Sequence, residues 1–248
     1  MTTLTQTVVI VSCIFTLNLV FETHALETTQ TVVQIEREVR NSLRNERDLS
    51  QIQVSVYGTE VTLTGRVPTF WAKNQAIKRA LEVEGVETVV SEIEIPSEEK
   101  DSDIAEDVGK SLRRYPHYTI WDHIEGRVDK GVVWLSGWVT PVRDKSGEIF
   151  ERVAKINGVQ DVQNDVRTLP PSTADASIRN ALAARIFSNI HFQQFSTRVN
   201  PPFHIIVHNS VVTLVGWVQS NLELIELQRI VRQTPGILRV ENELETIK

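Results

Sequence analysis

One pattern of apolar and polar positions is repeated three times along the 248-residue chain. Each repeat opens with aliphatic residues spaced four apart, which predicts an amphipathic helix, over residues 35–43, 104–112 and 178–186. Two short β-branched runs follow, joined by a turn rich in Gly, Asn and Asp, as is typical of a β-hairpin. A second apolar-striped helix and a last strand close each repeat. The predicted order is therefore helix, strand, strand, helix, strand.

The second strand of each hairpin carries the same motif, Val-x-Leu-x-Gly-x-Val, at residues 61–67, 133–139 and 212–218. Repetition of a motif at this spacing indicates duplicated domains. We therefore expect an α+β fold of three tandem small αββαβ domains, each a three-stranded sheet with two helices on one face. Proline-containing linkers set the predicted domain boundaries at residues 30–96, 101–169 and 174–246.

These features resemble the BON domain, an αββαβ module of bacterial periplasmic and outer-membrane-associated proteins. The resemblance rests on the hairpin motif, on the Gly-Val or Gly-Ile step at Gly85, Gly158 and Gly236, and on the last strands at residues 162–166 and 240–244. It implies a phospholipid-binding module without a catalytic residue set. Repeated BON units in osmotically induced periplasmic proteins are the nearest analogues in architecture.

Residues 1–25 differ from the rest of the chain, because they form a short apolar run that ends in small residues. This composition predicts a secretory signal peptide cleaved after Ala25, and hence a periplasmic protein. An uncleaved anchor and lipidation at Cys13 are the alternatives. Cys13 is the single cysteine, so the cleaved chain has no thiol for disulfides, thiolate catalysis or metal binding.

Composition and charge are those of an ordinary folded protein, with 41% hydrophobic and 23% charged residues. The net charge of -6 argues against duplex nucleic acid as a partner, because such binding depends on Lys and Arg. The third repeat is the exception. Its residues 174–248 carry 7 Lys and Arg against 6 Asp and Glu, whereas the other two repeats are acidic.

No residue constellation predicts chemistry. His204 and His208 are four residues apart, but on a predicted strand their side chains would start ~13 Å apart, too far to share a metal ion. There is no Gly-x-Ser-x-Gly elbow and no phosphate-binding loop. We expect no catalytic residue, no metal site and no cofactor.

The alternation of the hairpin motif sorts its side chains into two faces. Val, Leu and Gly should face the helices, with Gly allowing a helix to approach closely. The opposite face carries Trp134, Trp138 and Trp217, with Arg127 placed to stack on one of the rings. Either repeats two and three pack these faces against each other, or the faces dock a partner protein, a second chain or lipid headgroups.

A second candidate surface lies in the long connection of repeat three, which combines aromatic and basic residues: Arg185, His191, Phe192, Phe195 and Arg198. Such a mixture suits anionic headgroups. The alternative is that the two phenylalanines close the end of the domain.

The sequence thus predicts a non-enzymatic protein of the cell envelope that binds phospholipid, anionic in the first instance, or an envelope protein, and that supports envelope maintenance. The alternative is a periplasmic protein-interaction or holdase protein that uses the Trp-bearing sheet faces. The pattern does not address the oligomeric state.

Overall fold

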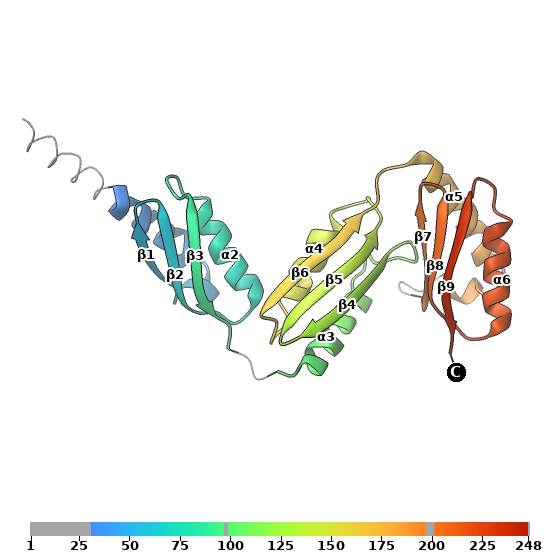
Figure 1. The fold of residues 1–248 in the computed structure, drawn as a ribbon, viewed down its shortest axis with the longest axis horizontal. Coiled ribbons are helices and arrows are strands. Elements are labelled where there is room, and N and C mark those ends of the chain that lie inside the picture. Colours follow the sequence, from blue (N-terminus) through green and yellow to red (C-terminus); the bar gives the residue numbers. More distant parts are fainter. Residues whose placement is uncertain (1–30, 97–98, 197–200, 248) are drawn as a thin grey trace, which may run out of the picture. The chain divides into compact units, whose positions relative to one another are not determined.

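The computed structural model describes residues 31–96, 99–196 and 201–247 (Figure 1). The predicted signal segment, with Cys13, lies outside these residues. Within them, no helix has the length and apolar character needed to cross a membrane. Three α+β repeats are present, each with a three-stranded mixed sheet, so the predicted fold class is confirmed.

Domain 1 comprises a helix over residues 31–44, the 3₁₀ turn η1 (Arg47–Leu49), β1 (Gln53–Tyr57), β2 (Glu60–Arg66), α2 (Phe70–Leu81) and β3 (Thr88–Glu94). The strand order is β1-β2-β3, with β1 antiparallel and β3 parallel to the central β2. The parallel pair requires α2 to cross over between β2 and β3, which places α2 against the sheet. Its own apolar cluster fills the space between sheet and helices.

Domains 2 and 3 repeat this order. Domain 2 has α3 (Asp101–Arg113), β4 (His123–Asp129), β5 (Val132–Val139), α4 (Lys145–Ala154) and β6 (Asp161–Thr168). Domain 3 has α5 (Thr173–Phe187), η2 (Gln193–Phe195), β7 (Phe203–His208), β8 (Val211–Val218), α6 (Asn221–Arg232) and β9 (Arg239–Thr246). The chain forms two compact units, Met1–Pro96 and Ser97–Lys248, so domains 2 and 3 belong to one unit.

The hairpin motif builds the core as predicted, because its Val and Leu residues are buried in all three domains. The expected reason for its glycine is wrong. Gly137 has φ 127° and Gly216 has φ 100°, a region of backbone space that favours glycine. A Cβ at Gly137 would lie 2.1 Å from the carbonyl oxygen of His123 on the neighbouring strand. The glycine therefore admits a cross-strand carbonyl and does not serve helix packing.

The hairpin turns of domains 2 and 3 are tied to the start of the first helix of their own domain. Lys130 and Gly131 both have positive φ, as a two-residue type I′ turn requires. Their amides donate to the Asp101 carboxylate at 2.7 and 2.8 Å. Asp175 accepts in the same way from the turn at residues 209–210. One carboxylate thus fixes each hairpin against its helix.

The first helices of domains 2 and 3 differ in how they are capped. Ser172 caps α5, since its hydroxyl accepts from the Asp175 amide at 3.1 Å. Asp101 does not cap α3, because its carboxylate is used by the hairpin turn, and the N-cap position is Lys100, which makes no side-chain cap bond.

Candidate functional site

The outer face of the domain 2 sheet carries Trp134 and Trp138 on β5, on the side away from the buried Val and Leu residues. Arg127 lies opposite Trp134 in the β4–β5 register. Its guanidinium carbon is 4.5 Å from the Trp134 ring centroid, which is the stacking that the sequence predicted. Arg167 on β6 lies 5.6 Å from the Trp138 ring in a similar position. Both rings are therefore partly covered by arginines of their own sheet.

The tryptophans differ in their relation to the neighbouring domain. Trp138 contacts domain 3, because its ring centroid lies 5.2 Å from that of His208. Trp217 on β8 stays 53% exposed and donates its indole N–H to Glu245 at 3.1 Å. Packing of domain 2 on domain 3 thus accounts for Trp138 and leaves Trp217 available.

The outer sheet faces of domains 2 and 3 are acidic. Strand alternation places two arginines and four carboxylates on the outer face of domain 2: Arg127, Arg167, Glu125, Asp129, Asp161 and Asp165. In domain 3 the outer side of β9 has one arginine and three carboxylates: Arg239, Glu241, Glu243 and Glu245. A net charge of two negative units on each face opposes anionic headgroups.

Phe192 and Phe195 must be corrected as candidate contacts, because both are buried in the core of domain 3. Each packs edge-to-face on Phe203, with ring centroids 5.7 and 5.4 Å away. The connection folds back and closes the end of the domain, which is the alternative considered for these residues. They cannot reach a lipid or a partner while this packing lasts.

The other predicted residues of this connection lie elsewhere. Arg185 is exposed at the end of α5, and His191 is half-buried. Arg198 lies outside the described residues.

Exposed aliphatic residues lie on the same connection and on α6. Ile190 is 76% exposed, and Leu222 and Ile225 on α6 are each 60% exposed. The Asn189 side chain donates to Glu226 at 2.8 Å, which ties the connection to the middle of α6. Residue type in the connection did not indicate this group, because the larger aromatic side chains there fit a membrane interface better. The sequence of α6 could have indicated it, because the helix has more apolar residues than one buried face can accommodate.

The helices beside this group are basic at their surface. Together α5 and α6 carry four arginines, Arg179, Arg185, Arg229 and Arg232, against three carboxylates, Asp175, Glu223 and Glu226. Two of the carboxylates, Asp175 and Glu223, are buried. The Arg229 guanidinium hydrogen-bonds to Glu226 and lowers the pKa of that carboxyl to about 2. We call Ile190, Leu222, Ile225, Arg185 and Arg229 the helix-side patch.

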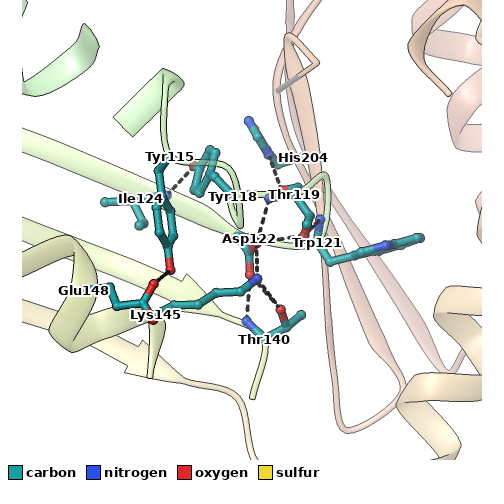
Figure 2. A network of polar contacts seen from close by, with 10 residues as sticks. All are labelled: Tyr115, Tyr118, Thr119, Trp121, Asp122, Ile124, Thr140, Lys145, Glu148 and His204. Atoms are coloured by element: carbon teal, nitrogen blue, oxygen red, sulfur yellow. Dashed lines mark hydrogen bonds and ion pairs between the residues drawn. The ribbon is translucent and has the colours of Figure 1, made fainter. Parts of the chain in front are cut away.

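A buried polar network joins domain 2 to domain 3 (Figure 2). The Lys145 ammonium lies 2.6 Å from Asp122 Oδ2, and both side chains are almost fully buried. Thr140 donates its amide and hydroxyl to Asp122 Oδ1 at 2.7 and 2.9 Å. Thr119 donates its amide and hydroxyl to Oδ2 at 2.8 and 2.7 Å. Both carboxylate oxygens are thus fully used in holding the segment 119–122 in place.

The segment 119–122 lies against β7 of domain 3. The Ile205 amide donates to the Ile120 carbonyl at 2.7 Å, and His204 Nδ1 lies 3.3 Å from the Thr119 carbonyl. The Ile120 side chain is buried in the apolar cluster of domain 3. Domain 2 therefore covers the edge strand of domain 3 with both a backbone bond and a core side chain.

Comparison with family models matches the BON domain to residues 31–97, 100–170 and 174–248. The chain belongs to the BON domain family. It consists of three tandem BON domains, a module that is generally non-catalytic. A search of curated proteins finds no match.

Among solved structures, the three BON domains are similar to the C-terminal domain of CdsD, a structural protein of the type III secretion system of Chlamydia trachomatis. The identity is 12%, with 86% of this chain and 96% of that chain covered and a TM-score of 0.25. The periplasmic domain of the type III secretion inner-membrane protein PrgH from S. typhimurium is 15% identical, with 80% and 96% covered and a TM-score of 0.19. No functional conclusion rests on likenesses this distant.

His204 is the one buried histidine at the junction of the second and third BON domains. Its ring lies 5.2 Å from that of Tyr118 and 5.9 Å from that of His123. Burial, and then the nearby His123, lower the pKa of His204 to about 4, so the ring is neutral at neutral pH. In the described part of the chain, no group of three His, Cys, Asp or Glu side chains is placed to hold a metal ion.

Proposed function

We propose that the chain is a non-catalytic binding protein of the bacterial envelope, and that its third BON domain docks on anionic phospholipid surfaces through the helix-side patch. The observation that supports this most directly is the grouping of Ile190, Leu222 and Ile225 beside exposed arginines. Aliphatic side chains enter the apolar boundary of a bilayer, and arginines favour its anionic headgroups.

The expected strength follows from the exposed side chains. Fully burying one aliphatic side chain contributes ~1.5–3 kcal/mol, so three that are already partly covered contribute roughly 3–5 kcal/mol. Each arginine near an anionic surface adds about 1 kcal/mol. Because entropy is lost on docking, the binding is weak and reversible.

The sheet faces are less suitable for this role. Their net negative charge opposes anionic headgroups, and Trp138 is already engaged with His208. We therefore assign lipid docking to the helices of the third BON domain.

A periplasmic location is part of the proposal and rests on the apolar segment at residues 1–25 and on the family resemblance. N-terminal sequencing of the protein recovered from a periplasmic extract tests it. A mature chain that begins after Ala25 supports secretion, whereas retention of the segment in a membrane fraction favours the anchor.

Vesicle co-sedimentation of the full chain tests lipid docking. The parent protein should pellet with vesicles of phosphatidylcholine and phosphatidylglycerol and much less with phosphatidylcholine alone. Ile190→Asp combined with Ile225→Asp should reduce this pelleting about tenfold or more, because it places carboxylates where apolar contact is needed. Val142→Asp is the matched control, since Val142 is 84% exposed in the second BON domain.

The result that would overturn the proposal is equal pelleting of the double variant and the control. Residues 1–25 are common to all these proteins, so any membrane affinity of that segment cancels in the comparison. The far-ultraviolet dichroism of both variants should match that of the parent, because all three substituted side chains are exposed.

The alternative function, a polypeptide-binding or holdase role for the Trp-bearing faces, is favoured by the exposure of Trp217. Iodide quenching of a chain whose other tryptophans are replaced by Phe tests it. The Trp217 signal should be accessible in the free protein and become shielded by an unfolded model substrate. Unchanged accessibility at saturating substrate would rule this role out.

A further inference from the structure

The strand opposite the hairpin motif differs between the three BON domains at one core position. Across the hairpin, the motif leucine pairs with Val54 in the first domain, Gly126 in the second and Ile205 in the third. Val54 and Ile205 are buried core residues, whereas Gly126 is exposed. The second BON domain therefore lacks one core side chain at the edge strand β4.

The missing side chain leaves a groove between α3 and β4. A cavity of about 470 Å³ lies there. Its lining from the second domain includes Val108, Arg113 and Gly126, and its lining from the third domain includes Pro202, His204 and Trp217. A Cβ placed on Gly126 would lie 3.6 Å from side-chain carbons of Leu135 and Val108, which is ordinary contact. The space thus accepts a side chain without displacing the core.

In the third BON domain the corresponding place is occupied. Ile205 holds the position of Gly126, and its outward-facing amide donates to the Ile120 carbonyl. Ile120 packs into the core there, and Trp121 lines one cavity with Ala176 and Asn180 of α5. The segment 119–122 is a β-turn, closed by the bond from the Asp122 amide to the Thr119 carbonyl. The fold therefore accepts a turn segment at its first strand, beside its first helix.

The edge of β4 offers the same backbone contact. The Ile124 amide faces outward and donates to the Tyr118 hydroxyl at 3.0 Å. Amides two residues apart on an edge strand face the same side, so the Gly126 amide faces outward as the Ile124 amide does. Among the described residues the structure shows no acceptor for that amide.

We propose that the groove between α3 and β4 of the second BON domain binds a turn segment of a partner protein, as β7 of the third domain binds the turn at residues 119–122. The segment places one aliphatic side chain over Gly126 and accepts a hydrogen bond from its amide, as Ile120 does at Ile205. The first BON domain does not offer such a side chain from its corresponding connection, because Leu49 is buried in its own core. None of the residues that line the cavity belongs to the helix-side patch, and the site takes a different class of ligand.

The probe is a synthetic peptide with the sequence of residues 118–123, since this segment accepts the bond from the Ile205 amide, the counterpart of the Gly126 amide, in the third BON domain. Titrated into the ¹⁵N-labelled full chain, it should produce saturable shifts at the amides of Gly126, Val108 and Leu112. The same peptide carrying I120D should not, because a carboxylate would be buried in the groove. The peptide should not displace the chain's own segment from β7, whose effective concentration is in the millimolar range.

The decisive variant is Gly126→Val, which gives the second BON domain the residue that the first carries at Val54. It should weaken peptide binding about tenfold or more while the thermal midpoint stays equal or rises, because the valine fills the groove from within. Glu125→Val is the matched control, since it adds the same side chain on the opposite face of β4 and should leave peptide affinity unchanged.

Three outcomes would overturn the proposal: no shift with the parent chain, shifts confined to β7, or equal affinity of Gly126→Val and the parent. Vesicle binding should be the same for Gly126→Val and the parent. Failure of the peptide site would therefore leave the lipid proposal standing, and the reverse also holds.

Discussion

Acidification should weaken the docking of the second BON domain on the third without unfolding either one. His204 lies on the outer face of β7, and the groups that face it at the junction all come from the second domain: Tyr118, Thr119, Asp122 and His123. A proton on the buried ring would place a positive charge beside His123 in a site that is 92% covered, since His204 is 8% exposed. Asp122 opposes this effect in part.

The magnitude follows from the pKa of His204 in the two states. It is 6.5 in a solvated ring and about 4 in the docked junction. Each pH unit between these values is worth about 1.4 kcal/mol, so docking should weaken by roughly 3–4 kcal/mol. The pKa of His204 is lowered only in the docked state. The stability of the docked junction is therefore complete above pH 6.5, is lost as the pH falls, and reaches its minimum below about pH 4.

Nuclear magnetic resonance of the labelled chain provides the assay. The amide of Ile205, bonded to the Ile120 carbonyl, and the indole of Trp138, packed on His208, both report on the junction. Both signals should move together as the pH falls from 7 to 4, while the core signals of each domain keep their dispersion. His204→Gln should remove most of this pH dependence, and His208→Gln, on the same strand, should retain it. An unchanged Ile205 signal at pH 4, or the same midpoint in His204→Gln, would refute the reasoning.

Two further predictions concern stability. Asp122→Ala leaves Lys145 buried without a counter-ion and should lower the unfolding free energy by ~3–5 kcal/mol in urea titration, whereas Arg66→Ala, which breaks an exposed pair with Glu94, should change it by less than ~1 kcal/mol. Equal effects would contradict the assignment of the buried pair. Gly137→Ala should cost ~1–3 kcal/mol or more, because the new Cβ would meet a carbonyl oxygen at 2.1 Å, and a neutral result would contradict the geometry.

The sequence predicted the fold because the same periodicities occur three times. Helical spacing, strand alternation and turn residues each indicate one element, and agreement between the repeats removes most ambiguity. The motif leucines Leu63, Leu135 and Leu214 are buried in all three domains for this reason. The role of the motif glycine was missed, since the approach of a neighbouring carbonyl is a property of the paired strands.

The binding residues were harder to predict. Phe192 and Phe195 fit a membrane interface by residue type, but an irregular connection has no periodicity to say which side chains fold back. The smaller Ile190 is the exposed one. Asp122 and Lys145 gave no signal at all, because two charged residues far apart in sequence read as surface charges until the fold brings them together.

The junction and the groove follow from one property of a small sheet. A three-stranded sheet has two edges, and some backbone amides of an uncovered edge strand have no hydrogen-bond acceptor within the sheet. In the third BON domain the segment 119–122 supplies an acceptor to β7, and the buried Asp122 network holds this segment in place. The second BON domain has the same edge at β4, with Gly126 in place of a core side chain. A glycine at this position weakens the strand unless another backbone or side chain packs over it. The glycine is therefore best explained by a bound segment from outside the domain.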